Sequence, residues 1–162
     1  MLTEEVVKTS GAGPGSAVAV NPLAMDDIEE LDLTMIRLKL QDMEEGPGWS
    51  PDQCDAVEKE YKRFLALKRA YQDREIVPDR LVDTFWHQHI LDTAKYAADC
   101  EVLFGAFLHH YPYFGMNGDE DYANLCTAFD ETRRLSQRHF GDASWSSPSA
   151  KCRTKCKPVR CK

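Results

Sequence analysis

The sequence lacks any long run of apolar residues. No apolar stretch approaches the roughly 20 residues that a membrane-spanning helix needs. The first residues also lack the basic segment and following apolar block that mark a secretory signal. These two absences argue against a membrane protein and a secreted one, and they favour a cytoplasmic location.

Acidic residues are absent from residues 143–162, although this segment carries six of the 20 lysines and arginines. The rest of the chain is therefore strongly acidic, since the whole chain has a net charge of -7. An acidic body repels phosphate backbones, so we expect no nucleic-acid partner. The basic tail is predicted either to fold back on the body or to bind an acidic protein or peptide partner.

Periodic apolar residues predict an all-α fold, a compact bundle of about five helices. With 162 residues, of which 43% are hydrophobic and 29% charged, the chain can form one domain with its own core. Residues 1–25 are predicted to be a disordered arm, the helical domain is expected over 26–142, and the basic Cys-rich tail follows it. The expected helices cover residues 28–43, 51–71, 79–91, 94–108 and 119–140.

Histidine is also scarce, with five residues, yet four of them lie between His87 and His110. Two of the four, His87 and His89, share the helix expected over 79–91. At 100° per residue their side chains point about 200° apart, so they cannot clamp one ion on a continuous helix. His89 falls within the apolar stripe of the helix, whereas His87 shares a flank with Asp83.

Two interpretations of His89 follow. In the first, it is a neutral core histidine that is hydrogen-bonded to a carboxylate or a carbonyl. In the second, it is a metal ligand, and its fellow ligands come from His87, His109, His110, Asp92 and Asp99. Imidazole with carboxylate suits iron, zinc or manganese, and two histidines with one carboxylate suit non-haem iron. The spacing matches no fixed zinc signature such as His-Glu-x-x-His.

Two neighbouring pairs bear on the same site. Asp83 and His87 are four residues apart, a spacing typical of an exposed helix pair; the alternative is a carboxylate that orients a ligand imidazole. His109 and His110 are adjacent at the end of an expected helix, so we expect one to face inward and one outward.

The six cysteines divide into two groups. Three fall in expected helices, where buried thiols are common, and Cys100 among them would become a thiolate ligand only beside a metal. Packing does not explain the other three, Cys152, Cys156 and Cys161, which lie among lysines and arginines that make thiols more reactive. These tail thiols are predicted to bind a soft ion, to form a disulfide with one thiol left over, or to be modified.

The chain carries four motifs in the order Tyr61-x-x-Phe64-Leu65, Val77-Pro78, Val82-Asp83-x-x-Trp86-His87-x-His89-x-Leu91 and Tyr96-x-x-Asp99-Cys100. Together they resemble the glycine-rich-domain-containing-protein-like family, and the likeness covers about residues 26–140. The further motif His109-His110-x-Pro112-Tyr113-Phe114-Gly115 is similar to the short microbial form, which has no glycine-rich region. The resemblance implies a helical domain with a His-rich block and no particular activity.

The sequence therefore predicts a metal-binding helical domain, with iron or zinc held near the Trp86-His87-x-His89 and His109–Gly115 segments. One form of this hypothesis is a metal-dependent enzyme that acts on its Cys-rich tail or receives its ion from it, although the sequence specifies no reaction. The alternative is a non-catalytic protein-interaction module, in which the His-rich block is a structural hydrogen-bond network.

Overall fold

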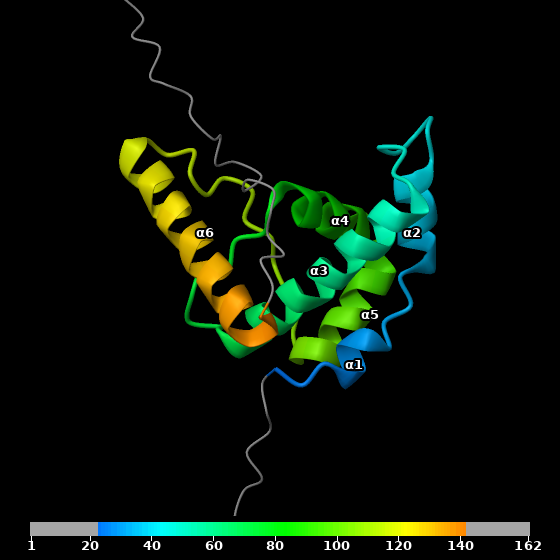
Figure 1. Cartoon of the computed structure of the whole chain (residues 1–162), viewed down its shortest axis with the longest axis horizontal. Helices are drawn as coiled ribbons and strands as arrows, with labels where there is room; N and C mark the ends of the chain where they lie inside the picture. Colours follow the sequence, from blue (N-terminus) through cyan, green and yellow to red (C-terminus); the bar gives the residue numbers. More distant parts are fainter. Residues whose placement is uncertain (1–22, 142–162) are drawn as a thin grey trace, which may run out of the picture.

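Six helices and no strand make up residues 23–141, the part of the chain that the computed structural model describes (Figure 1). The predicted all-α fold is thereby confirmed. The helices are α1 (Asp26–Glu29), α2 (Thr34–Gln41), α3 (Pro51–Ala70), α4 (Arg80–Leu91), α5 (Thr93–Phe104) and α6 (Asp119–Phe140). None of these helices is both long and apolar enough to cross a membrane. The predictions for the N-terminal arm up to residue 22 and for the tail, with Cys152, Cys156 and Cys161, lie outside the described residues.

The helix predicted over 28–43 is divided into α1 and α2. Between them the side chain of Asp32 accepts a hydrogen bond from the backbone N–H of Thr34 (3.1 Å), a local turn that starts a new helix. The restart changes which residues face the core. Leu33 is buried, whereas Met35, an apolar residue of the helix predicted over 28–43, is 68% exposed. The prediction of one continuous helix was wrong because this side-chain turn competed with the apolar period.

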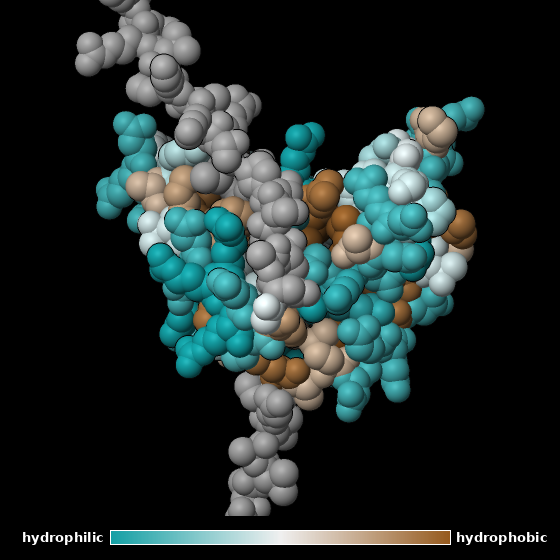
Figure 2. All heavy atoms as spheres, viewed as in Figure 1, coloured by the Kyte–Doolittle hydropathy of each residue, from teal (hydrophilic) through white to brown (hydrophobic). Residues whose placement is uncertain are grey.

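Helix α3 passes through the middle of the fold. It begins as predicted, with Pro51 in its first turn and the hydroxyl of Ser50 accepting from the N–H of Gln53 (3.1 Å). Its buried side chains, which include Tyr61 and Phe64, pack against α4, and helices α1, α2 and α5 pack around this pair. On the face shown in Figure 2 most of the surface is hydrophilic, and hydrophobic residues appear only in small separate patches.

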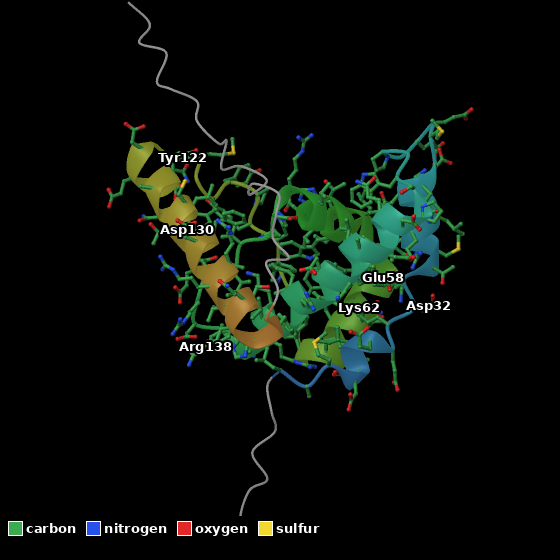
Figure 3. All side chains as sticks on the ribbon, in the orientation of Figure 1. Asp32, Glu58, Lys62, Tyr122, Asp130 and Arg138 are labelled. Carbon is green, nitrogen blue, oxygen red and sulfur yellow. The ribbon has the colours of Figure 1, made fainter. Side chains whose placement is uncertain are left out.

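Lys62 of α3 shows how this fold treats a buried charge. Its side chain is 8% exposed, and its ammonium group lies 3.0 Å from a Glu58 carboxylate oxygen and 3.5 Å from one of Glu29. The same nitrogen donates to the backbone carbonyl of Glu29 (3.0 Å). Figure 3 shows Lys62 and Glu58 on successive turns of α3. Three oxygen partners compensate for the lost hydration of the ammonium group and tie α1 to α3.

Carboxylates cap the next two helices. Asp79 accepts from the N–H of Val82 (2.8 Å) at the start of α4, and burial raises the pKa of Asp79 to about 6. Asp92 caps α5 in the same way, so that the chain turns sharply between α4 and α5. Helix α5 ends before the predicted residue 108, because Gly105 adopts a left-handed conformation (φ 66°) and terminates it.

Helix α6 lies to one side of the other five (Figure 1). It is fastened to the end of α3 and to the segment that precedes α4. The backbone N–H of Val77 donates to the hydroxyl of Thr132 (3.0 Å), and the hydroxyl of Tyr71 lies 2.6 Å from Nε2 of His139. These contacts leave space between α6 and α4, and the loop over residues 105–118 borders it.

Candidate metal site and adjoining pocket

His87 and His89 lie on two different faces of α4, as the helical wheel predicted. His89 is 1% exposed and points into the core. The side chain of His87 is 51% exposed and points away from the core. The two histidines therefore belong to different environments, and each has its own set of partners.

Both ring nitrogens of His89 have buried partners. Nδ1 lies 2.8 Å from the hydroxyl of Tyr61, and Nε2 lies 2.9 Å from a carboxylate oxygen of Asp99. Burial lowers the pKa of His89, with the charge of Asp99 opposing that shift, so the ring is neutral at pH 7. A carboxylate can only accept, so Nε2 carries the proton and Nδ1 accepts from the hydroxyl of Tyr61. The geometry matches the first interpretation of His89, a hydrogen-bonded core histidine.

The carboxylates proposed as fellow ligands of His89 have other roles. Asp99 lies 2.9 Å from the ammonium group of Lys95 as well as from His89. Asp92 is exposed and caps α5. A neighbouring network supports the same core, since the indole N–H of Trp86 donates to the hydroxyl of Tyr96 (2.9 Å), which donates to the carbonyl of Leu108 (2.7 Å).

The outward face of α4 holds a cluster made of Asp83, His87 and His110, which we call the triad. Nε2 of His110 lies 3.0 Å from Nε2 of His87 and 3.3 Å from Oδ1 of Asp83. Nε2 of His87 lies 3.7 Å from the same oxygen. In the described part of the chain this is the group of histidines, cysteines and carboxylates whose ligand atoms converge closely enough for a metal ion.

The loop after α5 brings His110 to α4. Because the carbonyl of Leu108 is held by Tyr96, the following residues run along the outer face of α4. The ring of His110 packs on Trp86, with centroids 4.5 Å apart, and its side chain is 15% exposed. The adjacent His109 is exposed and lies against the ring of Phe107. The prediction of one inward and one outward histidine is thus confirmed.

The dimensions of the triad suit a metal ion. A circle through its three ligand atoms has a radius of about 1.9 Å, so an ion slightly above their plane would lie about 2.1 Å from each atom. This is the length of a bond from zinc to imidazole or carboxylate. The three atoms occupy one side of the ion and leave its other side open.

The structure thus brings together two of the six predicted ligands, His87 and His110. It keeps His89, His109, Asp92 and Asp99 away from them. Asp83 completes the set, although its spacing from His87 had favoured an exposed pair. The side chain of Asp83 is only 16% exposed. The only sequence signal for this role was that i,i+4 spacing, and the approach of His110 depends on a loop that no helical period describes.

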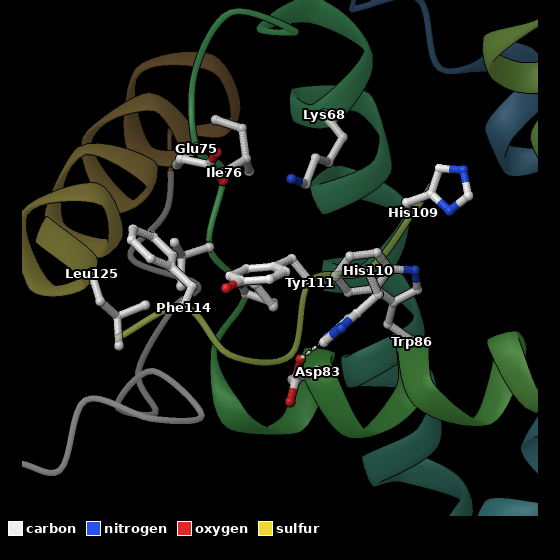
Figure 4. A pocket seen from close by; sticks show the side chains of 12 residues that line it. Lys68, Glu75, Ile76, Asp83, Trp86, His109, His110, Tyr111, Phe114 and Leu125 are labelled. Atoms are coloured by element: carbon white, nitrogen blue, oxygen red, sulfur yellow. Dashed lines mark hydrogen bonds and ion pairs between the residues drawn. The ribbon is translucent and has the colours of Figure 1, made fainter. Parts of the chain in front are cut away.

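A pocket of about 390 Å³ adjoins the triad (Figure 4). It lies between α4, the end of α3, the segment before α4, the loop and α6. Asp83, Trp86 and His110 form one side, and Lys68 extends from α3 with its amino group directed into the space. The remaining walls are largely apolar and include Val77, Pro78, Phe114 and Leu125. Its volume is within the usual range for small-molecule sites, about 300–1,000 Å³.

Gly115 lies in the loop beside the pocket, where the loop contacts α6. Its φ of 84° is left-handed, and a Cβ at this position would lie 2.6 Å from the side chain of Leu125. Its N–H donates to the carboxylate of Asp121 (2.7 Å) on the first turn of α6. The N-cap is Gly118, without a side-chain hydrogen bond. Gly115 therefore permits the close contact between the loop and α6.

The family model described as UCP032817-like matches residues 32–130, more than half of the chain. The chain therefore belongs to this family, and the matched segment contains the whole triad. No curated protein and no solved structure matches the chain. The resemblance to the glycine-rich-domain-containing-protein-like family stays a prediction.

Proposed function

We propose that this member of the UCP032817-like family binds one divalent transition-metal ion, iron or zinc, through Asp83, His87 and His110. The convergence of two imidazole nitrogens and one carboxylate oxygen on a common point carries this proposal. Three protein ligands on one side of an ion are typical of catalytic zinc sites and of non-haem iron sites, since both keep positions open for water or substrate.

The surroundings of the triad support a role in chemistry rather than in folding. A structural zinc site is closed by four protein ligands, and the triad offers three. The triad also lies on the outer face of α4, and none of its three side chains belongs to the buried core. An ion at the triad would polarise a bound carbonyl or lower the pKa of bound water, as metal ions do in hydrolases. We therefore propose a metal-dependent enzyme, with substrate entering the adjoining pocket.

The proposal also gives the three tail cysteines a role. Because they lie in a basic segment, they could deliver a soft ion to the triad, or they could be the thiol substrate on which the metal site acts. A triad of nitrogen and oxygen ligands works with either role, because it does not itself require sulfur.

Metal analysis of the full-length chain tests the proposal. The wild type, produced in metal-replete medium and freed of loose ions, is expected to hold about one ion per chain. His110→Ala should lose nearly all of it, and His109→Ala, a change of the adjacent exposed histidine, should retain it. Replacing the three tail cysteines by serine should leave the triad ion in place. Circular dichroism checks that every variant keeps its helices.

Two outcomes would refute the proposed site. One is less than about 0.1 ion per chain in the wild type, since a site with useful affinity would be largely filled under these conditions. The other is an ion that disappears with the tail cysteines and persists in His110→Ala, which would place the metal in the tail.

A second candidate is the non-catalytic interaction module. The observation in its favour is the row of exposed side chains on the loop, namely Tyr111 (63% exposed), Tyr113 (57%) and Met116 (66%). Aromatic residues and methionine are enriched in protein interfaces. An absence of metal in the wild type would favour this candidate.

A further inference from the structure

Lys68 makes no hydrogen bond and no ion pair with any residue among 23–141, which distinguishes it from Lys62 two turns earlier on α3. Lys62 has three oxygen atoms around its ammonium group. Lys68 is also partly buried, yet it makes neither a hydrogen bond nor an ion pair with any described residue. Burial lowers the pKa of Lys68, and the charge of Glu75 acts against that shift. A partly buried ammonium group without a hydrogen-bond acceptor costs stability, so a ligand is the natural source of that acceptor.

The direction of the side chain indicates where that partner lies. Lys68 points into the pocket, whose opposite side is formed by Asp83 and His110 (Figure 4). The walls between these two polar regions include Trp86 and Val77 and offer mainly apolar surface. The pocket thus has two separate polar regions with apolar walls around the space between them.

The charges of the pocket depend on the metal. Lys68 contributes a positive charge, and the lining carboxylates Glu75 and Asp83 contribute two negative charges. A divalent ion at the triad would turn this balance positive and would put a second cationic centre in the pocket. An anion would then find one positive centre on the metal side and another at Lys68.

We infer that the pocket binds a small aliphatic dicarboxylate, with one carboxylate on the metal ion of the triad and the other paired with Lys68. The methylene groups between them would lie against the apolar walls. This inference rests on the proposed metal site, and it adds the substrate class. A monocarboxylate could satisfy only one of the two cationic centres, so it should bind more weakly.

Calorimetric titration of the zinc-loaded, full-length chain tests the inference. The probes form two matched pairs, succinate with butyrate and glutarate with pentanoate, each pair differing in the second carboxylate. The wild type should bind at least one diacid about tenfold to a hundredfold more tightly than its monoacid, the range for a hydrogen bond to a charged group. In Lys68→Met this preference should vanish. Lys59→Met removes an exposed lysine of the same helix and should preserve it.

Failure of the inference can be told apart from failure of the metal site. Zinc content, measured on the wild type and on His110→Ala after free zinc has been removed, reports on the triad through its difference, because both chains keep the tail cysteines. If the wild type holds about one zinc ion per chain that His110→Ala lacks, but neither diacid is preferred, the inference is wrong and the metal site stands. A diacid preference that persists in Lys68→Met overturns it as well. If the wild type holds no zinc, the proposed function itself fails, and the inference with it.

Discussion

Histidine and aspartate side chains meet at both the inner and the outer face of α4, but they are largely buried and hydrogen-bonded at the inner face and border a pocket at the outer one. On the inner face, His89 is buried, and Tyr61 and Asp99 occupy both of its nitrogens. On the outer face, His87 and His110 direct Nε2 atoms toward each other and toward one carboxylate oxygen. Hydrogen-bond satisfaction makes the inner histidine part of the architecture. Convergence of ligand atoms next to a pocket makes the outer pair a candidate site.

The largest expected effect concerns the inner face. His89→Ala should lower the free energy of unfolding by about 3 to 5 kcal/mol, because it leaves a cavity and two buried polar groups without partners. His110→Ala should cost less, about 1 to 2 kcal/mol when no metal is present, because it removes a partly buried ring that packs on Trp86 but leaves no fully buried polar group without a partner. Denaturant unfolding in the presence of a chelator measures both values. Similar losses in the two variants would remove the distinction between the faces.

Metal should stabilise the protein through the outer face only. At a free zinc concentration 100 times the dissociation constant, the wild type should gain about 2.7 kcal/mol in unfolding free energy. His110→Ala should gain almost nothing, and His109→Ala should gain as much as the wild type. Thermal unfolding with and without zinc provides the measurement. A full gain in His110→Ala would place the ion elsewhere.

Acid should reveal the protonation state of the inner histidine. The pKa of His89 is lowered in the folded state, so the unfolded chain binds the proton more readily. Its contribution to stability is therefore complete above about pH 6.5 and is lost as the pH falls below that value, by at most about 1.4 kcal/mol per pH unit. Asp79 acts in the opposite direction, because its raised pKa of about 6 makes protonation favour the folded state as the pH falls.

His89→Gln separates these two contributions. A glutamine amide has a donor nitrogen and an acceptor oxygen, as the neutral histidine ring has a donor and an acceptor nitrogen, but it does not titrate. Relative to the wild type, this variant should keep its stability better between pH 6.5 and 5, as followed by urea unfolding at several pH values. An unchanged slope would mean that His89 is not held neutral.

The smallest expected effect concerns Lys68 at the pocket. Lys68→Met should raise the unfolding free energy by about 0.5 to 1 kcal/mol, because it removes a partly buried charge that has no described partner. Lys62→Met, in contrast, should destabilise the protein, since it removes the ammonium group that forms an ion pair with the carboxylate of Glu58. Thermal unfolding of the two variants compares them directly. A loss of stability in Lys68→Met would show that its charge is compensated within the protein.

Sequence reasoning succeeded where one helix determines the outcome. The wheel separated His87 from His89, and the helix starts expected at residues 51 and 79 lie at or next to the first residues of α3 and α4. It failed where side-chain turns or contacts between distant segments determine the structure. The turn at Asp32 interrupted the first helix, and the triad needed a loop to carry His110 across α4 to Asp83.

The metal position itself is the most direct test of the difference between the faces. Anomalous diffraction at the zinc edge, from crystals of the full-length chain loaded with zinc, would locate the ion. We predict a peak about 2.0 to 2.2 Å from Nε2 of His87, Nε2 of His110 and a carboxylate oxygen of Asp83. A peak at His89 or at the tail cysteines, with none at the triad, would contradict the account.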